Sequence, residues 1–152
     1  MKKNYSHLFL TLALSLLLFI SPGANAAEKA KPTVCKQCNM NIEEANRKSA
    51  VYVMQGIEAS GFDDIGCAVA WRNGECAMRQ SAFDENAVAH DYLSEETVPV
   101  EKAFYVVSSD IKTPMGYGIA AFKNKEQAVK FASGHGNSKV VTLNELISLK
   151  LK

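Results

Sequence analysis

The hydrophobic positions of the chain form one long apolar run near its start and several short runs further on. Residues 8–20 are apolar almost without interruption. The later runs are short, rich in β-branched and aromatic residues and bounded by turn formers, a pattern typical of strands. Strands are predicted in this way at 50–54, 57–62, 103–107, 117–122 and 140–141, with a weaker candidate at 88–92.

Capping residues predict a helix after the second of these strands. Asp63 or Asp64 can cap a helix that runs to about Arg72. The Asn-Gly pair at 73–74 then ends it, because glycine readily takes the left-handed conformation that helix ends prefer.

Two more helices are predicted near the C-terminus. Asn124, with Gln127 three residues later, forms a capping box for a helix through residue 132 that is ended by Gly134. Residues 143–149 predict a closing helix.

Short segments of the chain recur further along the sequence at two fixed offsets. The Tyr-Val pair at 52–53 recurs 53 residues later, whereas Phe62 and the segment 68–71 align with residues 60 positions further on. Each copy then reads strand, strand, helix, strand, so the predicted fold class is α+β, with two similar ββαβ units sharing one core. The second copy has a longer loop between its first two strands, and this loop carries residues 113–116.

The start of the chain is typical of a cleaved secretory signal. Lys2 and Lys3 precede an apolar run that is shorter than the ~20 residues of a bilayer span and is followed by a small-x-small site at 24–26. We therefore expect a signal peptide at 1–26, a flexible lead at 27–34 and one domain at 35–152. The mature protein would be periplasmic, without stable membrane insertion after cleavage.

Composition narrows the class of partner. The chain has 17 basic and 16 acidic residues, and its formal charge becomes −1 when Lys2 and Lys3 are removed with the signal. This balance argues against nucleic acid or an anionic membrane surface as the partner. An exported protein folds in an oxidising compartment, where its four cysteines would ordinarily form two disulfides.

Candidate chemistry concentrates in the motif Cys35-x-x-Cys38-x-Met40. Soft sulfur ligands select Cu(I), Zn(II) or iron–sulfur clusters, and among these Cu(I) is the ion that makes most use of a neutral thioether. Without Met40, the two cysteines would equally suit a redox dithiol or half of a zinc site. Met40 therefore favours copper.

Two later residues are further candidate ligands. Met115 lies between a proline and a glycine, outside any apolar stripe, where a core methionine is not expected. His135 lies between two glycines just after a predicted helix. It is either an exposed histidine that favours the helix dipole or an imidazole ligand on a flexible turn.

Cys67 and Cys76 are the remaining cysteines. Cys67 is either a small buried hydrophobic residue or half of a disulfide with Cys76 across the turn at 73–74. A zinc site built from all four cysteines is less favoured, because eight residues separate these two where a zinc knuckle has two to four.

Motifs along nearly all of the mature chain match one family in their order. They are Cys35-x-x-Cys38-x-Met40, the segment 62–67 through Trp71, Tyr105-Val106-Val107, Met115-Gly116-x-Gly118 with Ala121-Phe122, and His135-Gly136 followed by Val140. Together they resemble the NosL family, the exported copper chaperones or accessory proteins of nitrous oxide reductase. Asn39 stands where many members have glycine, and asparagine also tolerates a left-handed backbone.

The resemblance implies a Cu(I)-binding chaperone, not an enzyme, on a fold of two ββαβ units. The implied partners are the copper ion, apo nitrous oxide reductase as the client, and the maturation machinery of that enzyme. The implied ligands are Cys35, Cys38, Met40 and Met115, with His135 as an additional candidate.

The alternative function is a thiol–disulfide oxidoreductase in which Cys35 attacks and Cys38 resolves. The position of the pair argues against it, because the pair does not follow a strand and open a long helix.

Overall fold

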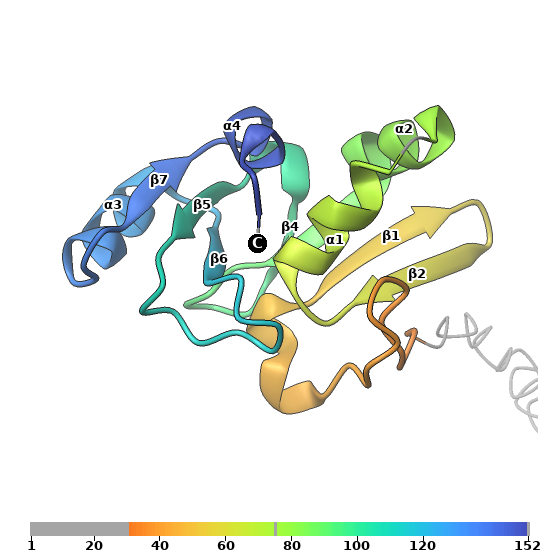
Figure 1. Ribbon diagram of the computed structural model, residues 1–152, viewed down its shortest axis with the longest axis horizontal. Helices are drawn as coiled ribbons and strands as arrows, with labels where there is room; N and C mark the ends of the chain where they lie inside the picture. The colour runs from red at the N-terminus through yellow and green to blue at the C-terminus, as the bar shows by residue number, and fades with distance from the viewer. Residues whose placement is uncertain (1–30, 75, 152) are drawn as a thin grey trace, which may run out of the picture. The chain divides into compact units, whose positions relative to one another are not determined.

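The computed structural model describes residues 31–74 and 76–151 (Figure 1). The predicted signal peptide at 1–26 and the first part of the predicted lead, 27–30, lie outside the described residues. Within the described part of the chain, no helix is long and apolar enough to span a membrane.

The first unit is a four-stranded antiparallel sheet with two helices. Its strands, in the order β2-β1-β3-β4, are β1 (Val51–Gln55), β2 (Glu58–Phe62), β3 (Ala87–His90) and β4 (Thr97–Pro99). Between β2 and β3 the chain forms α1 (Ile65–Arg72) and α2 (Ala77–Asn86). Figure 1 shows α1 crossing one face of this sheet. Short 3₁₀ helices, η1 (Glu44–Ser49) and η2 (Val100–Lys102), flank the unit.

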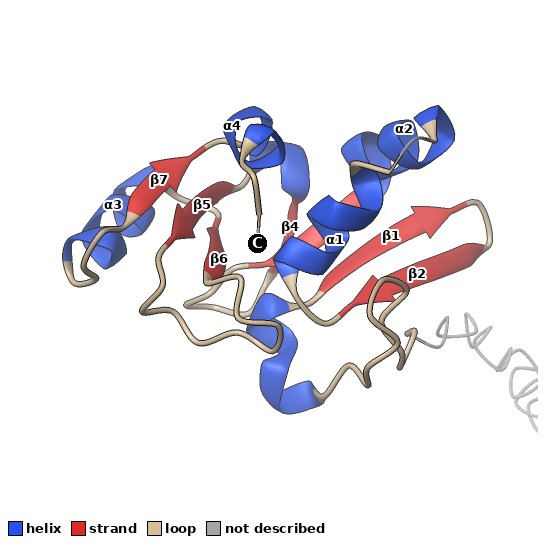
Figure 2. Ribbon diagram, in the orientation of Figure 1, coloured by secondary structure: helices blue, strands red, loops and turns tan. Residues whose placement is uncertain are grey.

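The second unit repeats the strand, strand, helix, strand order of the first and lacks counterparts of α2 and β4. It consists of β5 (Phe104–Val107), β6 (Ile119–Phe122), α3 (Lys125–Ser133) and β7 (Lys139–Val141), with the strands in the order β6-β5-β7. The closing helix, α4 (Leu143–Ser148), follows it (Figure 2).

The first strand of each unit pairs with its neighbours in a corresponding register. Tyr52 in β1 pairs with Gly61 on one side and Val88 on the other. Tyr105, 53 residues after Tyr52, pairs with Ala121 of β6 and Val141 of β7. These partners lie 60 residues after Gly61 and 53 residues after Val88. The predicted α+β fold of two ββαβ units is therefore confirmed.

The positions at which α1 and α3 start and end agree with the sequence, whereas the backbone conformation at their C-terminal ends differs. The Asp64 carboxylate accepts the Gly66 N–H at 2.9 Å and caps α1, and the Asn124 side chain caps α3. The predicted left-handed glycine ends are wrong. Helix α1 ends on Asn73 (φ −74, ψ −1) and α3 on Gly134 (φ −89, ψ 0), both in the right-handed region.

The hydrophobic pattern does not predict strand β4 or helix α2. Phe83 is the only buried residue of α2, and the rest of the helix is largely polar. A single buried position cannot produce the 3.6-residue periodicity that identifies an amphipathic helix.

One buried cluster joins the two units. It contains Phe62 and Trp71 of the first unit, whose ring centroids are 5.3 Å apart, together with Tyr105 of the second and Leu146 of α4. The units therefore share a core, and side chains from both can reach one site.

Candidate metal centre

The first cysteine motif forms a closed turn over residues 35–40. The Cys35 N–H donates to the Met40 carbonyl at 2.8 Å, and the Asn39 N–H donates to the Cys35 carbonyl at 2.9 Å. Asn39 has φ 63, so the left-handed backbone that its sequence position suggests is present. The Lys36 N–H also donates to the Gly61 carbonyl at 2.9 Å, which fixes the 35–40 turn against β2.

The turn brings its two thiols to the start of α1. The ligand atoms of Cys35, Cys38, Asp63 and Cys67 all lie within 4.8 Å of one another. The Cys38 thiol donates to Asp63 Oδ1 at 3.4 Å. Asp63 is the residue before the Asp64 cap of α1, and Cys67 lies in the first turn of that helix. We call these four residues the thiol–carboxylate cluster.

Burial is uneven across the thiol–carboxylate cluster. Cys35, Asp63 and Cys67 are each 1% exposed or less. Cys38 is only half-buried, so it marks the side from which an ion or a partner could approach. A buried set of soft ligands with one accessible side suits a site that must both hold and release a metal.

The surroundings keep the buried thiols protonated. Burial, assisted by a hydrogen bond with Asp63, raises the pKa of the Cys35 thiol. Burial also raises the pKa of Cys67, and the neighbouring acidic groups of Cys35 and Asp63 raise it further. A soft metal ion would therefore displace protons as it binds, because the thiolate is the ligand.

The β5–β6 loop, residues 108–118, reaches the same place from the second unit. The Met115 N–H donates to Asp64 Oδ2 at 3.0 Å, while Oδ1 of the same carboxylate caps α1. The Tyr117 ring packs on Gly66 so closely that an added Cβ at Gly66 would overlap it. The longer hairpin loop predicted from the sequence thus lies beside the thiol–carboxylate cluster.

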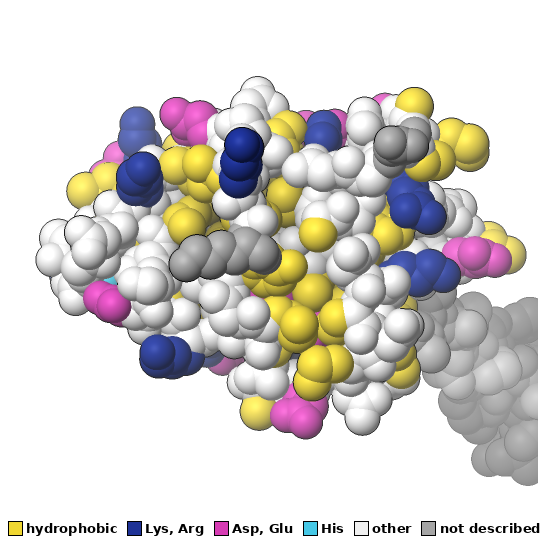
Figure 3. Space-filling model, in the orientation of Figure 1, with side chains coloured by type: hydrophobic (Ala, Val, Ile, Leu, Met, Phe, Trp, Pro, Cys, Tyr) yellow, Lys and Arg dark blue, Asp and Glu magenta, His cyan; other side chains and the backbone are white. Residues whose placement is uncertain are grey.

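The two predicted thioether ligands lie at the surface. Met40 is 53% exposed and Met115 is 40% exposed. Figure 3 shows hydrophobic side chains gathered over the N-terminal end of α1 and the β5–β6 loop. The backbones of both methionines adjoin the thiol–carboxylate cluster, while their ligand roles stay predictions.

His135 lies at the end of α3. Its Nδ1 is 2.8 Å from the Phe131 carbonyl, and its ring stacks on Phe131 with centroids 4.2 Å apart. The structure does not place it among the four clustered ligand groups. Its ligand role also stays a prediction.

Cys67 and Cys76 have different surroundings. All four cysteines are free, Cys67 faces Cys35 and Cys38, and Cys76 is exposed at the start of α2. The disulfide between Cys67 and Cys76 is not formed, and Cys76 does not belong to the thiol–carboxylate cluster. Sequence reasoning did not count Asp63 among the candidate ligands and left Cys67 out of the copper ligands, because the approach of both residues to the 35–40 turn depends on the fold.

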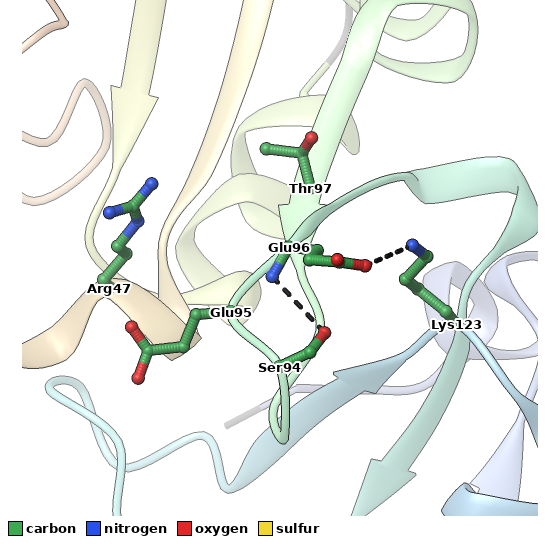
Figure 4. A pocket seen from close by; sticks show the side chains of 6 residues that line it. All are labelled: Arg47, Ser94, Glu95, Glu96, Thr97 and Lys123. Carbon is green, nitrogen blue, oxygen red and sulfur yellow. Dashed lines mark hydrogen bonds and ion pairs between the residues drawn. The ribbon is translucent and has the colours of Figure 1, made fainter.

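A polar pocket elsewhere in the described residues has different chemistry. It is lined by Arg47, Ser94, Glu95, Glu96, Thr97 and Lys123 (Figure 4). Lys123 Nζ is ion-paired with Glu96 Oε2 at 2.6 Å. Its oxygen and nitrogen groups do not form a soft-metal site.

The fold and the thiol–carboxylate cluster together define a class, a two-unit α+β domain with a candidate soft-metal centre. The family model NosL matches residues 26–149, so the chain belongs to the NosL family. The crystal structure of the copper chaperone NosL from Shewanella denitrificans is similar, with a TM-score of 0.52 and 20% sequence identity over 82% of this chain and 96% of that one. This likeness shows a shared fold. A search of curated proteins finds no match.

Proposed function

We propose that this protein is an exported Cu(I) carrier that delivers copper to a cuproenzyme, with nitrous oxide reductase as the client. The observation that supports the proposal most strongly is the thiol–carboxylate cluster, where Cys35 and Cys38 from one turn meet Cys67 from α1 within 4.8 Å. The NosL family membership and the copper chaperone of similar fold agree with copper as the cargo. Several sulfur ligands select a soft ion such as Cu(I) over the hard divalent cations.

The proposed ligands are Cys35, Cys38, Met40 and Met115. Cys35 anchors the buried side, and Cys38 lies at the accessible side with the exposed thioethers nearby. An incoming ligand of the client could bind copper at this side before the carrier's own ligands leave, so the ion is never free. His135 is an additional candidate, and its Nε2 is the ring nitrogen to consider, because Nδ1 contacts the Phe131 carbonyl.

We also propose that the protein acts in the periplasm after removal of residues 1–26. Its role is to carry the ion, not to turn over a substrate. The alternative role of thiol–disulfide oxidoreductase is disfavoured, because burial raises the pKa of the Cys35 thiol, whereas an attacking cysteine needs a lowered pKa and an accessible sulfur.

A transfer experiment tests delivery. The reduced protein is loaded with Cu(I) under anaerobic conditions and mixed with apo nitrous oxide reductase in the presence of a Cu(I) chelator. We expect the enzyme to gain copper and its visible absorption, and we expect the Cys35→Ser/Cys38→Ser variant to fail. Equal copper gain from the chelator complex alone would contradict the proposal.

A further inference from the structure

We propose that Cys67 is a third thiolate ligand of the carried copper ion, so that three thiolates bind the ion between the 35–40 turn and α1. The inference rests on the proposed function and deepens it. A disulfide between Cys67 and Cys76 is not formed, and a role as a small hydrophobic residue does not account for a thiol that faces Cys35 and Cys38.

The distances suit coordination by all three thiols. The sulfur atoms of Cys35, Cys38 and Cys67 lie within 4.8 Å of one another, with no metal present. Three thiolates around one ion, at metal–sulfur distances of about 2.3 Å, would lie about 4 Å apart. Each pair therefore needs to close by no more than about 1 Å, a shift that side-chain rotation can supply.

Cys67 is held in place by a rigid element. It lies in the first turn of α1, three residues after the Asp64 cap, and is 1% exposed. The fixed carboxylate of Asp64 orders this helix start and also binds the β5–β6 loop through the Met115 N–H. Preorganised ligands on a helix lose less freedom on binding than ligands on a mobile segment.

The three thiols differ in burial, so different residues can retain the copper ion and allow its release. Cys35 and Cys67 form the buried floor of the site, and Cys38 is its half-buried edge. An incoming ligand of the client would bind the ion from the side of Cys38. Cys67 would therefore be among the last ligands to dissociate from the ion. A third thiolate would thus raise retention without closing the side that a client must reach.

Cysteine variants test this role, and Cys76 provides a matched control because it is the exposed cysteine outside the thiol–carboxylate cluster. Anaerobic competition with a Cu(I) chelator is measured for Cys67→Ala and Cys76→Ala. We expect Cys67→Ala to weaken Cu(I) binding by about tenfold or more, since even changes around the ligands of a metal site cost about 10–100-fold. Cys76→Ala should bind as the unmodified protein does. Equal affinity for both variants would overturn the inference.

A second measurement keeps Cys67 intact and so does not depend on how well a variant folds. Copper X-ray absorption is recorded on the loaded Met40→Leu/Met115→Leu variant, in which cysteines are the remaining sulfur ligands proposed. Three sulfur neighbours per copper are expected, and two would overturn the inference.

The variants Cys35→Ala and Cys38→Ala distinguish a failure of this inference from a failure of the proposed carrier function. If these two variants lose copper while Cys67→Ala does not, Cys67 is not a ligand and the proposed carrier function is still supported. Full copper retention by all three variants would contradict the carrier function itself.

Discussion

Met115 is held by its backbone and leaves its thioether exposed. The Asp64 carboxylate accepts the Met115 N–H at 3.0 Å, whereas the side chain itself is 40% exposed. A change of this side chain therefore leaves the anchor of the β5–β6 loop in place. The sulfur can be tested separately from the fold.

Met115→Leu should cost less than about 1.5 kcal/mol of apo stability, because leucine is close to methionine in volume and apolarity. We expect weaker Cu(I) retention against a chelator, with a larger deficit at mildly acidic pH, where protonating thiols leave thioethers a greater share of the binding. Met54→Leu in β1 is the matched control. Equal affinity of the variant and the unmodified protein across that pH range would remove Met115 from the site.

The raised thiol pKa values predict how copper binding depends on pH. Burial raises the pKa of Cys35 and of Cys67, so both thiols hold their protons in the neutral apo protein. Cu(I) binding must release these protons, and the apparent affinity should rise by up to about tenfold per pH unit for each thiol that deprotonates. Chelator competition between about pH 6 and pH 8 measures this slope. A flat profile would show that the thiols are not ligands.

At the scale of the elements, the contact between α1 and the β5–β6 loop joins the two units beside the thiol–carboxylate cluster. Gly66 in α1 lies directly beneath the Tyr117 ring, and Gly116 and Gly118 on either side of Tyr117 have φ 73 and 67. These positive φ values favour glycine, so the loop conformation is encoded locally. Its contact with α1 depends on the absence of a side chain at position 66.

Gly66→Ala should displace the β5–β6 loop, because the new Cβ would overlap the Tyr117 ring. We expect a loss of about 1–3 kcal/mol in the free energy of unfolding, as for other overpacked sites. Gly134→Ala is the matched control, since its added Cβ would meet only ordinary contacts, 3.6 Å from the Phe131 carbonyl. Equal melting temperatures for the two variants would contradict this account of the loop.

Most of the elements could be predicted because their signals are local. Strand runs and the Asn124 cap depend on neighbouring residues, and the repeat offsets agree with the observed registers. Helix α2 lacks such a signal, since Phe83 alone is buried. The prediction of left-handed helix ends failed because glycine permits that conformation without requiring it.

The residues of the candidate site also differ in whether local sequence predicts them. The spacing of Cys35, Cys38 and Met40 is visible in one short segment, whereas the approach of Cys67 to Cys35 depends on the path of β2 and α1 between them. A contact across 32 positions leaves no periodic trace in one sequence. Sequence reasoning therefore favoured a core or disulfide role for Cys67 over a zinc site built from all four cysteines.

At the scale of the whole molecule, a buried histidine links stability to pH. His90 in β3 is 1% exposed, and its Nδ1 lies 3.1 Å from the Ala50 carbonyl. Burial lowers its pKa below the ordinary value of 6.5, so the unfolded chain binds a proton that the folded chain excludes. The resulting stability is fully present above that ordinary value and is lost as the pH falls toward the lowered one.

The free energy of unfolding should therefore decrease as the pH falls below about 6.5. His90→Asn does not titrate and keeps an amide that can contact the Ala50 carbonyl, so it should flatten this dependence. Denaturant unfolding at several pH values measures the effect. An unchanged pH profile in the variant would show that other groups are responsible.

Copper uptake by the reduced protein tests the central claim most directly, because a disulfide offers no thiolate to Cu(I). The reduced protein and a form shown by mass spectrometry to hold the Cys35–Cys38 disulfide are each titrated anaerobically against a chromophoric Cu(I) chelator. Our account predicts that the reduced protein withdraws Cu(I) from the chelator and that the disulfide form does so far less. Full Cu(I) uptake by the disulfide form, or none by the reduced form, would contradict it.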